Sequence, residues 1–172
     1  VKGGRGSSYF ASEGTLYEPG RYPAGSAEAP ADVTLNQSFA YVFPASAGMH
    51  YWNLSVADGV HAEIHGGQLN LGDFELGGTS SLMFGSWYTG GPADVEALVF
   101  DSIALTNTAV LGLPRSVNVH RYEMDSIAIA SGASLFVGRG DWTFANTDSG
   151  GTVSVPHGRG VEIQCRSADI RG

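Results

Sequence analysis

Short runs in which apolar and polar residues alternate recur along this sequence, and two of them are near copies. The hexapeptides DSIALT at 101–106 and DSIAIA at 125–130 lie 24 positions apart. Each is followed at the same distance by a second apolar pair, Ile103 and Leu105 leading to Leu111 and Leu113, and Ile127 and Ile129 leading to Leu135 and Val137. Self-similarity at a fixed period is typical of proteins built from stacked repeats.

The same spacing of eight positions between apolar pairs occurs in three further places. Phe74 and Leu76 precede Leu82 and Phe84, Val153 and Val155 precede Val161 and Ile163, and Trp52 and Leu54 precede Val60 and Ala62. We expect third strands in between, at Leu69–Leu71, Val95–Val99, Val117–Val119 and Trp142–Phe144. The units then begin near positions 52, 74, 103, 127 and 153, at intervals of about 22 to 29 residues.

These runs predict an all-β protein. Alternation with period two buries one face of each strand, and Gly, Pro, Asn and Asp between the runs indicate tight bends, such as the one at Asn107. Three short strands per unit match one coil of a single-stranded parallel β-helix, here of about five to six coils, whose stacking buries a continuous core. An antiparallel β-sandwich or jelly roll also has short strands at such intervals and remains the alternative.

The chain divides into an extended N-terminal arm and lead-in, residues 1–32, and a β-helix-like domain, residues 33–172. The first eight residues are Gly/Ser-rich and basic, and Pro19, Pro23 and Pro30 exclude a central strand from that part of the lead-in. The last unit stops part way through a coil at Gly172. We therefore expect further chain or another subunit to cover that end.

From about residue 50 onward the sequence resembles the right-handed β-helix proteins of the pectin-lyase-like kind. The segments that carry the resemblance are DSIALTN, DSIAIAS, FELGGTSSLMFG and VEIQCRSADIRG, with TLYEPGRYPAG similar to the lead-in of such proteins. The class includes polysaccharide lyases, glycoside hydrolases, and the tailspikes and fibres of bacteriophages. The resemblance implies the right-handed coil and, through the tailspikes, a homotrimer. It includes no diagnostic catalytic motif.

Composition and charge limit the kinds of partner that we expect for this protein. The net charge of −8 argues against a surface that binds nucleic acid, and no apolar run of 18 residues is present, so we expect no membrane insertion. The single cysteine, Cys165, allows no intrachain disulfide and is expected to be a small buried apolar residue. We expect no cofactor.

The sharpest local pattern is His61-Ala62-Glu63-Ile64-His65. On a strand, His61, Glu63 and His65 would project from one face and offer two imidazoles and a carboxylate to a zinc-like ion. Neighbouring side chains on one face of a strand are roughly 6.6–7 Å apart, so an ordinary solvated face is the simpler interpretation.

Asp101 and Asp125 occupy equivalent positions in successive units. Stacked in register, their carboxylates would lie roughly 4.8–5.5 Å apart, close to the separation in retaining glycosidases. They are weak catalytic candidates, because an Asp that caps the turn before its strand has the same position.

Trp87 and Tyr88 are the ligand-binding candidates. They lie in the segment SWYTGGP at 86–92, which lengthens one unit and is predicted to be an inserted loop. Flat aromatic faces on such a loop suit sugar rings or a protein partner, and packing over a neighbouring coil or subunit is the alternative.

The sequence favours a structural or attachment protein of a virion or cell surface, of the phage tailspike, fibre or capsid-decorating type, over an enzyme. Self-association, other virion or surface proteins and polysaccharide are the partners we expect. The alternatives are a polysaccharide-degrading lyase or glycoside hydrolase on the same fold, and an extracellular adhesin or filament subunit. We expect the protein on a virion, outside the cell or at the cell surface.

Overall fold

Strands form where apolar and polar residues alternate, and they pair side by side in parallel. In the computed structural model the described residues are 15–16, 22–43, 48–85, 95–113, 121–137 and 162–171. This part of the chain contains strands and no helix, and every strand pairing in it is parallel. The all-β class is therefore confirmed, and the antiparallel alternative does not describe these strands.

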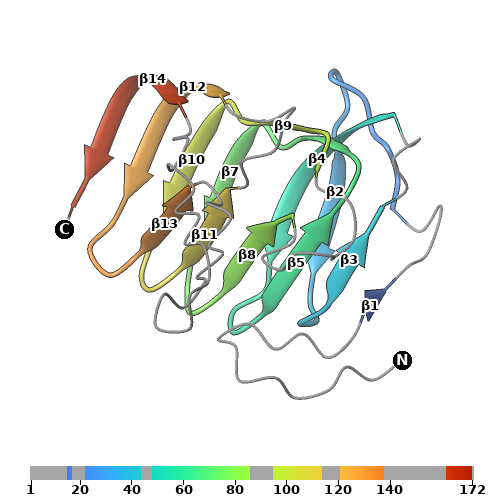
Figure 1. The fold of residues 1–172 in the computed structure, drawn as a ribbon, viewed down its shortest axis with the longest axis horizontal. Helices are drawn as coiled ribbons and strands as arrows, with labels where there is room; N and C mark the ends of the chain where they lie inside the picture. Colours follow the sequence, from blue (N-terminus) through green and yellow to red (C-terminus); the bar gives the residue numbers. More distant parts are fainter. Residues whose placement is uncertain are drawn as a thin grey trace, which may run out of the picture.

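The strands belong to three sheets (Figure 1). The six-stranded sheet contains, in spatial order, β1 (Thr15–Leu16), β3 (Ala40–Val42), β5 (His61–His65), β8 (Ser81–Phe84), β11 (Val110–Leu113) and β13 (Ser134–Val137). One four-stranded sheet contains β7 (Asp73–Leu76), β10 (Ser102–Leu105), β12 (Arg121–Ile129) and β14 (Glu162–Ile170). The other contains β2 (Ala31–Leu35), β4 (Met49–Val56), β6 (Gln68–Asn70) and β9 (Ala97–Val99).

The two near-identical hexapeptides lie side by side, in the register that their similarity predicted. Ile103 on β10 pairs with Ile127 on β12 and, on its other side, with Phe74 on β7. The second apolar pairs stack in the same way, since Leu111 lies between Leu82 and Leu135 in the six-stranded sheet. Equivalent residues of successive repeats therefore form columns.

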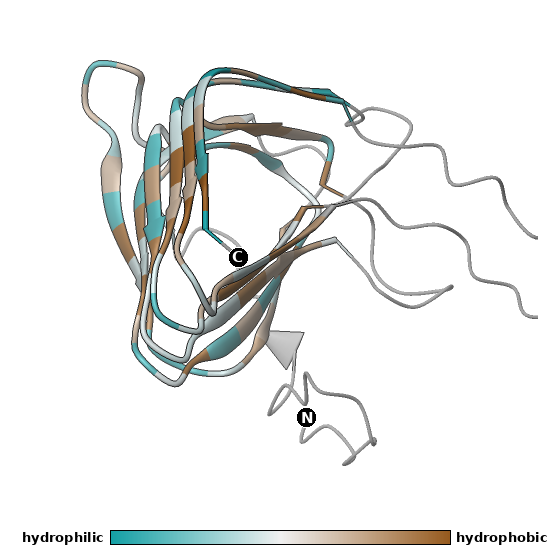
Figure 2. Ribbon diagram, turned by 90° about the vertical axis from the view of Figure 1, so that its left-hand side faces the viewer, coloured by the Kyte–Doolittle hydropathy of each residue, from teal (hydrophilic) through white to brown (hydrophobic). Residues whose placement is uncertain are grey.

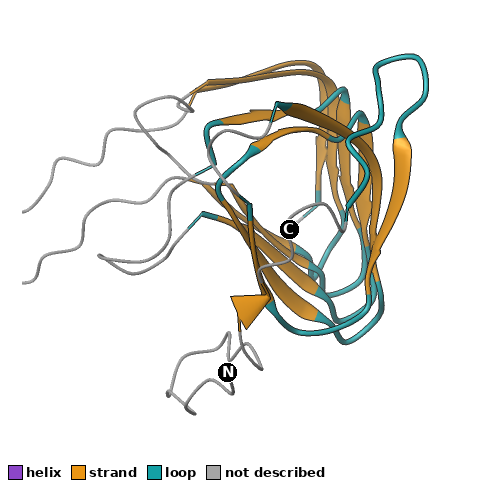
Figure 3. Cartoon of the chain, turned by 90° about the vertical axis from the view of Figure 1, so that its right-hand side faces the viewer, coloured by secondary structure: helices purple, strands orange, loops and turns teal. Residues whose placement is uncertain are grey.

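The inward side chains of the three sheets fill one apolar interior. Figure 3 shows the sheets as sides around a common interior, and in Figure 2 hydrophobic and hydrophilic residues alternate along the strands. The largest fully buried side chains include Trp52, Phe74, Phe84, Ile103 and Leu105. Burial of this continuous apolar surface is the main term that stabilises the stack.

Strands β12 and β14 each run through a bend and contribute to two sides of the stack. They pair from Arg121 with Glu162 to Met124 with Cys165, and again from Ser126 onward, but not at the bend between the two runs. The alternation changes phase there, because Tyr122, Met124 and Ile127 all point inward and are buried. The inward spacing of two, three and two residues recurs in the earlier repeats as Leu69, Leu71, Phe74, Leu76 and as Leu98, Phe100, Ile103, Leu105.

One prediction about the last unit is wrong. The columns of Ile127 and Ile129 continue with Ala168 and Ile170, and not with Val153 and Val155. The predicted partner Ile163 lies beside Tyr122, so it does not continue the Leu135 column. Val153-Ser154-Val155 has the alternation of a strand, but alternation alone does not say which segment continues a column. The predicted strands at 117–119 and 142–144 and the basic arm at 1–8 lie outside the described residues.

The bend between β10 and β11 needs a left-handed backbone, as its asparagine suggested. Asn107 has a φ of 56°, and Gly78, two residues beyond β7 as Asn107 is beyond β10, has a φ of 65°. Asn and Gly are the residues that adopt this conformation at least cost. The carboxylate of Asp58 lies against Gly78 and accepts hydrogen bonds from the backbone N–H (2.8 Å) and the hydroxyl (3.1 Å) of Thr79.

We expect Asp58 to make stability depend on acid pH. The hydrogen bonds from Thr79, first from its backbone N–H, lower the pKa of Asp58 below its ordinary 3.8. A carboxylate with a lowered folded-state pKa stabilises the fold above its unfolded-state pKa, and this contribution is lost as the pH falls through the folded-state value. Urea unfolding of Asp58→Asn should therefore show a smaller loss of stability below about pH 4 than the wild type. Glu28→Gln, at another exposed turn, is the matched control, and an unchanged acid slope in Asp58→Asn would contradict the role.

Candidate functional site at the bend of the stack

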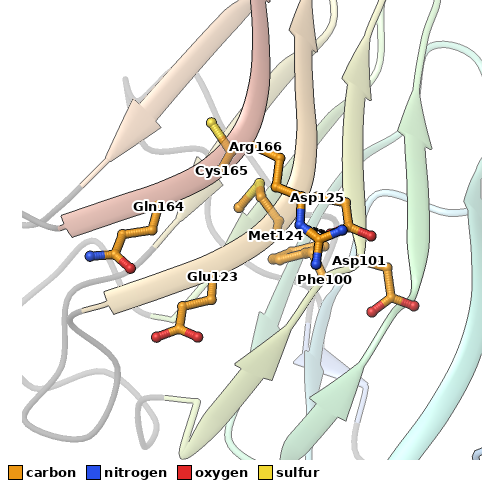
Figure 4. A pocket seen from close by; sticks show the side chains of 8 residues that line it. All are labelled: Phe100, Asp101, Glu123, Met124, Asp125, Gln164, Cys165 and Arg166. Atoms are coloured by element: carbon orange, nitrogen blue, oxygen red, sulfur yellow. Dashed lines mark ion pairs between the residues drawn. The ribbon is translucent and has the colours of Figure 1, made fainter.

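A hollow of about 440 Å³ lies on the outer surface at the bend of the last repeats. Figure 4 shows its lining from close by. The residues come from β12, β14 and the segment between β9 and β10, and they are Phe100, Asp101, Glu123, Met124, Asp125, Gln164, Cys165 and Arg166.

At the bend, the charged residue of one repeat lies beside the charged residue of the following repeat. The backbone N–H of Asp125 donates to the carbonyl of Asp101 at 2.7 Å, and the N–H of Asp101 donates to the carbonyl of Gly72 at 2.7 Å. Arg166 follows in the next strand, and its Nε lies 3.3 Å from Oδ1 of Asp125 (Figure 4). Backbone hydrogen bonds thus fix the positions of Asp101 and Asp125, and the ion pair places the side chain of Arg166 beside Asp125.

The floor of the hollow is apolar and belongs to the core. Phe100 and Met124 are buried, and Cys165 is half-buried beside Met124. The ring of Phe100 packs against those of Phe74 and Phe84, with centroids 5.8 and 6.1 Å apart. The polar groups above the floor therefore lie on a rigid base, which reduces the entropy that a ligand would have to remove on binding.

A ladder of polar side chains forms one wall. Arg121 donates through Nη2 to Oε1 of Gln164 at 2.6 Å and forms an ion pair of 2.8 Å with Glu123. Gln164 in turn donates through Nε2 to Oε1 of Glu162 at 2.6 Å. In Figure 4 the side chains of Glu123 and Gln164 lie next to each other on neighbouring strands. These groups present hydrogen-bond acceptors and donors at a fixed spacing.

The charge of the hollow is negative. Asp101, Glu123, Asp125 and the guanidinium of Arg166 line it, and in the adjoining ladder the charge of Arg121 is balanced by that of Glu162. The side chain of Asp125 is 69% exposed, so the site is open to water. Carboxylates in this arrangement suit hydroxyl and ammonium groups, and they repel phosphate or uronate groups.

Both weak catalytic candidates, Asp101 and Asp125, thus lie in one hollow. Sequence reasoning missed Glu123, Gln164 and Arg166, which complete it. The signal that could have found Glu123 and Gln164 is the matching alternation of 121–124 and 162–165, where RYEM and EIQC place apolar residues at the same two positions.

The three candidate metal ligands do not all share the same hydrogen-bond partners. Oε2 of Glu63 lies 2.9 Å from Nε2 of His65, whereas Nδ1 of His61 lies 2.8 Å from the hydroxyl of Ser81. His65 is only 2% exposed, so the three residues do not share a solvated face as expected. The described residues contain no group of three His, Cys, Asp or Glu side chains that could hold a metal ion. Trp87 and Tyr88 lie outside the described residues.

Comparisons with known proteins found no relative of this chain. No protein-family model, no curated protein and no solved structure matches this chain. Within the described part of the chain, no helix has the length and apolar character that crossing a membrane requires.

Proposed function

We propose that this chain is a right-handed parallel β-helix that acts as a structural or attachment module of a virion or cell surface, and that its hollow binds carbohydrate. Parallel stacking of equivalent residues in three sheets supports the β-helix, because such stacking needs a chain that returns to the same place in every repeat. The right hand follows from the strong preference of parallel crossover connections.

The observation that carries the proposal is the fixed polar ladder on an otherwise apolar base. Asp101, Glu123, Asp125 and Gln164 offer hydrogen-bonding groups at the spacing of neighbouring strands. Sugar hydroxyls are recognised by such carboxylates and amides. The excess of carboxylates favours a neutral or amino-sugar polysaccharide over a polyuronate.

The binding experiment compares variants of the hollow with a matched surface variant. Immobilised neutral, amino-sugar and uronate polysaccharides are titrated with wild type, Asp125→Ala, Gln164→Ala and the control Glu75→Gln, whose exposed side chain lies on β7 away from the hollow. We expect the two hollow variants to bind an amino-sugar or neutral polymer at least about tenfold more weakly, a loss of about 1.4 kcal/mol. The control should bind like the wild type. Equal binding by all four proteins, or no binding to any polymer, would contradict the proposal.

A glycoside hydrolase is the second candidate function, and the position of Asp101 beside Asp125 in one hollow favours it. Neighbouring strands lie about 4.8 Å apart, which is close to the carboxylate separation of about 5–5.5 Å that retaining glycosidases use. The openness of the site argues against it, because acid–base catalysis by carboxylates is usually tuned by an enclosed surrounding. If the wild type releases new reducing ends from a polysaccharide, and Asp101→Asn and Asp125→Asn do not, the protein is an enzyme. If the wild type releases none, the result supports a binding module.

A further inference from the structure

Asp101 is the carboxylate of the hollow that contacts no cationic side chain among the described residues. Glu123 lies 2.8 Å from Nη2 of Arg121, and Asp125 lies 3.3 Å from Nε of Arg166. In Figure 4 the ion pair runs from Arg166 to Asp125, and the carboxylate of Asp101 stands apart from it. A charge that the protein leaves uncompensated in a binding site is available to a ligand of opposite charge.

The carboxylate of Asp101 is also open on the side of the preceding repeat. Gly72 occupies the equivalent place there, because its carbonyl accepts the hydrogen bond from the N–H of Asp101 as the carbonyl of Asp101 accepts that from Asp125. Gly72 has no side chain, and a Cβ at this position would lie 3.8 Å from Oδ2 of Asp101. A ligand group can therefore approach this carboxylate in the space that a side chain at position 72 would fill.

An apolar side chain lies close to this carboxylate along the chain. Val99 and Asp101 flank the buried Phe100, and both are exposed, Val99 to 38%. Residues two apart in an extended segment point to the same side, with side chains roughly 6.6–7 Å apart. The surface at this edge of the hollow thus combines one free anionic group with one apolar contact.

From this combination we propose that the hollow selects sugars with a free amine, and that Asp101 determines this specificity by binding the ammonium group. The inference rests on the proposed carbohydrate binding. A glucosamine unit has an ammonium group on the edge of its ring and C–H groups on the face, so it can contact Asp101 and Val99 together. A hydrogen bond between two charged groups is stronger than one between neutral groups. N-acetylated and neutral sugars lack the charge that compensates Asp101, and a uronate adds another carboxylate.

The test uses hexamers of glucosamine, N-acetylglucosamine and glucose, which differ in charge but share the pyranose ring and the length. In isothermal titration at low salt, the wild type should bind the glucosamine hexamer at least about tenfold more tightly than the other two. This preference should shrink at high salt, because salt screens exposed charges. Asp101→Asn should reduce the preference to about threefold or less. Glu75→Gln removes a carboxylate from β7, outside the hollow, and should keep the full preference.

The outcomes separate this inference from carbohydrate binding itself. Equal affinity of the wild type for the three hexamers, or an undiminished preference in Asp101→Asn, would overturn the selection of amines and leave carbohydrate binding in place. No binding of any hexamer would contradict the proposed function, and the inference with it. A lysine hexapeptide carries the charge without the sugar ring and should bind at least about tenfold more weakly than the glucosamine hexamer. Binding of both with equal affinity would show recognition of cations in general and would also overturn the proposal.

Discussion

Leu105→Ala should lower the free energy of unfolding by about 2–5 kcal/mol, whereas Ile170→Ala should lower it by less than about 1 kcal/mol. Both residues occupy the same column, but Leu105 is enclosed by the repeats on either side, while Ile170 is mostly exposed. Deleting a buried side chain costs its transfer free energy and leaves a cavity, and an exposed one costs little. The comparison therefore measures how burial varies along one column.

Urea unfolding, followed by circular dichroism, supplies the two values. The protein should be diluted until it is monomeric, because self-association stabilises the folded state by mass action and would raise the apparent cost at Ile170. Ile103→Ala, in the neighbouring column, should behave like Leu105→Ala. Equal losses at Leu105 and Ile170 would contradict the described position of β14 at the end of the stack.

Trp52→Ala should be the most destabilising single substitution at the N-terminal end of the stack, with a loss of about 3–5 kcal/mol. Trp52 is buried, its ring packs against Tyr22, Phe43 and His50, and its Nε1–H donates to the carbonyl of Pro23 at 2.8 Å. The substitution removes the largest side chain of this aromatic cluster and the bond that holds the preceding segment on the stack.

Trp52→Phe separates the two contributions. It keeps most of the apolar volume but removes the donor to the carbonyl of Pro23, so we expect a smaller loss of about 1–3 kcal/mol. Val99→Ala, at a half-exposed position of β9, is the control and should change stability by about 0.5 kcal/mol or less. A loss below about 1 kcal/mol for Trp52→Ala would show that this cluster does not stabilise the fold.

The register of the central strands could be predicted because stacking requires like residues in line. DSIALT and DSIAIA repeat since Ile103 and Ile127 must fill the same column, and this constraint is visible in one sequence. The bent strands were missed, although the spacing of two, three and two between Leu69, Leu71, Phe74 and Leu76 carries the signal. The step from Ile127 to Ala168 could not be predicted, because the sequence separation between neighbours in a column is not constant: it is 24 residues from Ile103 to Ile127 and 41 from Ile127 to Ala168.

The candidate site was predictable only in part for the same reason. Asp101 and Asp125 occur at matching places in two obvious copies. Arg166 belongs to a repeat whose register the sequence pattern misplaced, so its contact with Asp125 had no local signal. His65 was expected at a solvated face because alternation places it outward, and alternation does not say whether an outward side chain is covered.

A disulfide between positions 104 and 128 tests the in-register parallel stacking most directly. Ala104 and Ala128 are paired across β10 and β12, so Ala104→Cys/Ala128→Cys in a Cys165→Ala background should oxidise to an intrachain disulfide that peptide mapping identifies. Ala104→Cys/Ser126→Cys, offset by two residues, should not. Cross-linking of the first pair and not the second is the result that the parallel columns predict. A failure of the 104–128 pair to form, or equal formation of the offset pair, would contradict the stacking from which the hollow and the columns both follow.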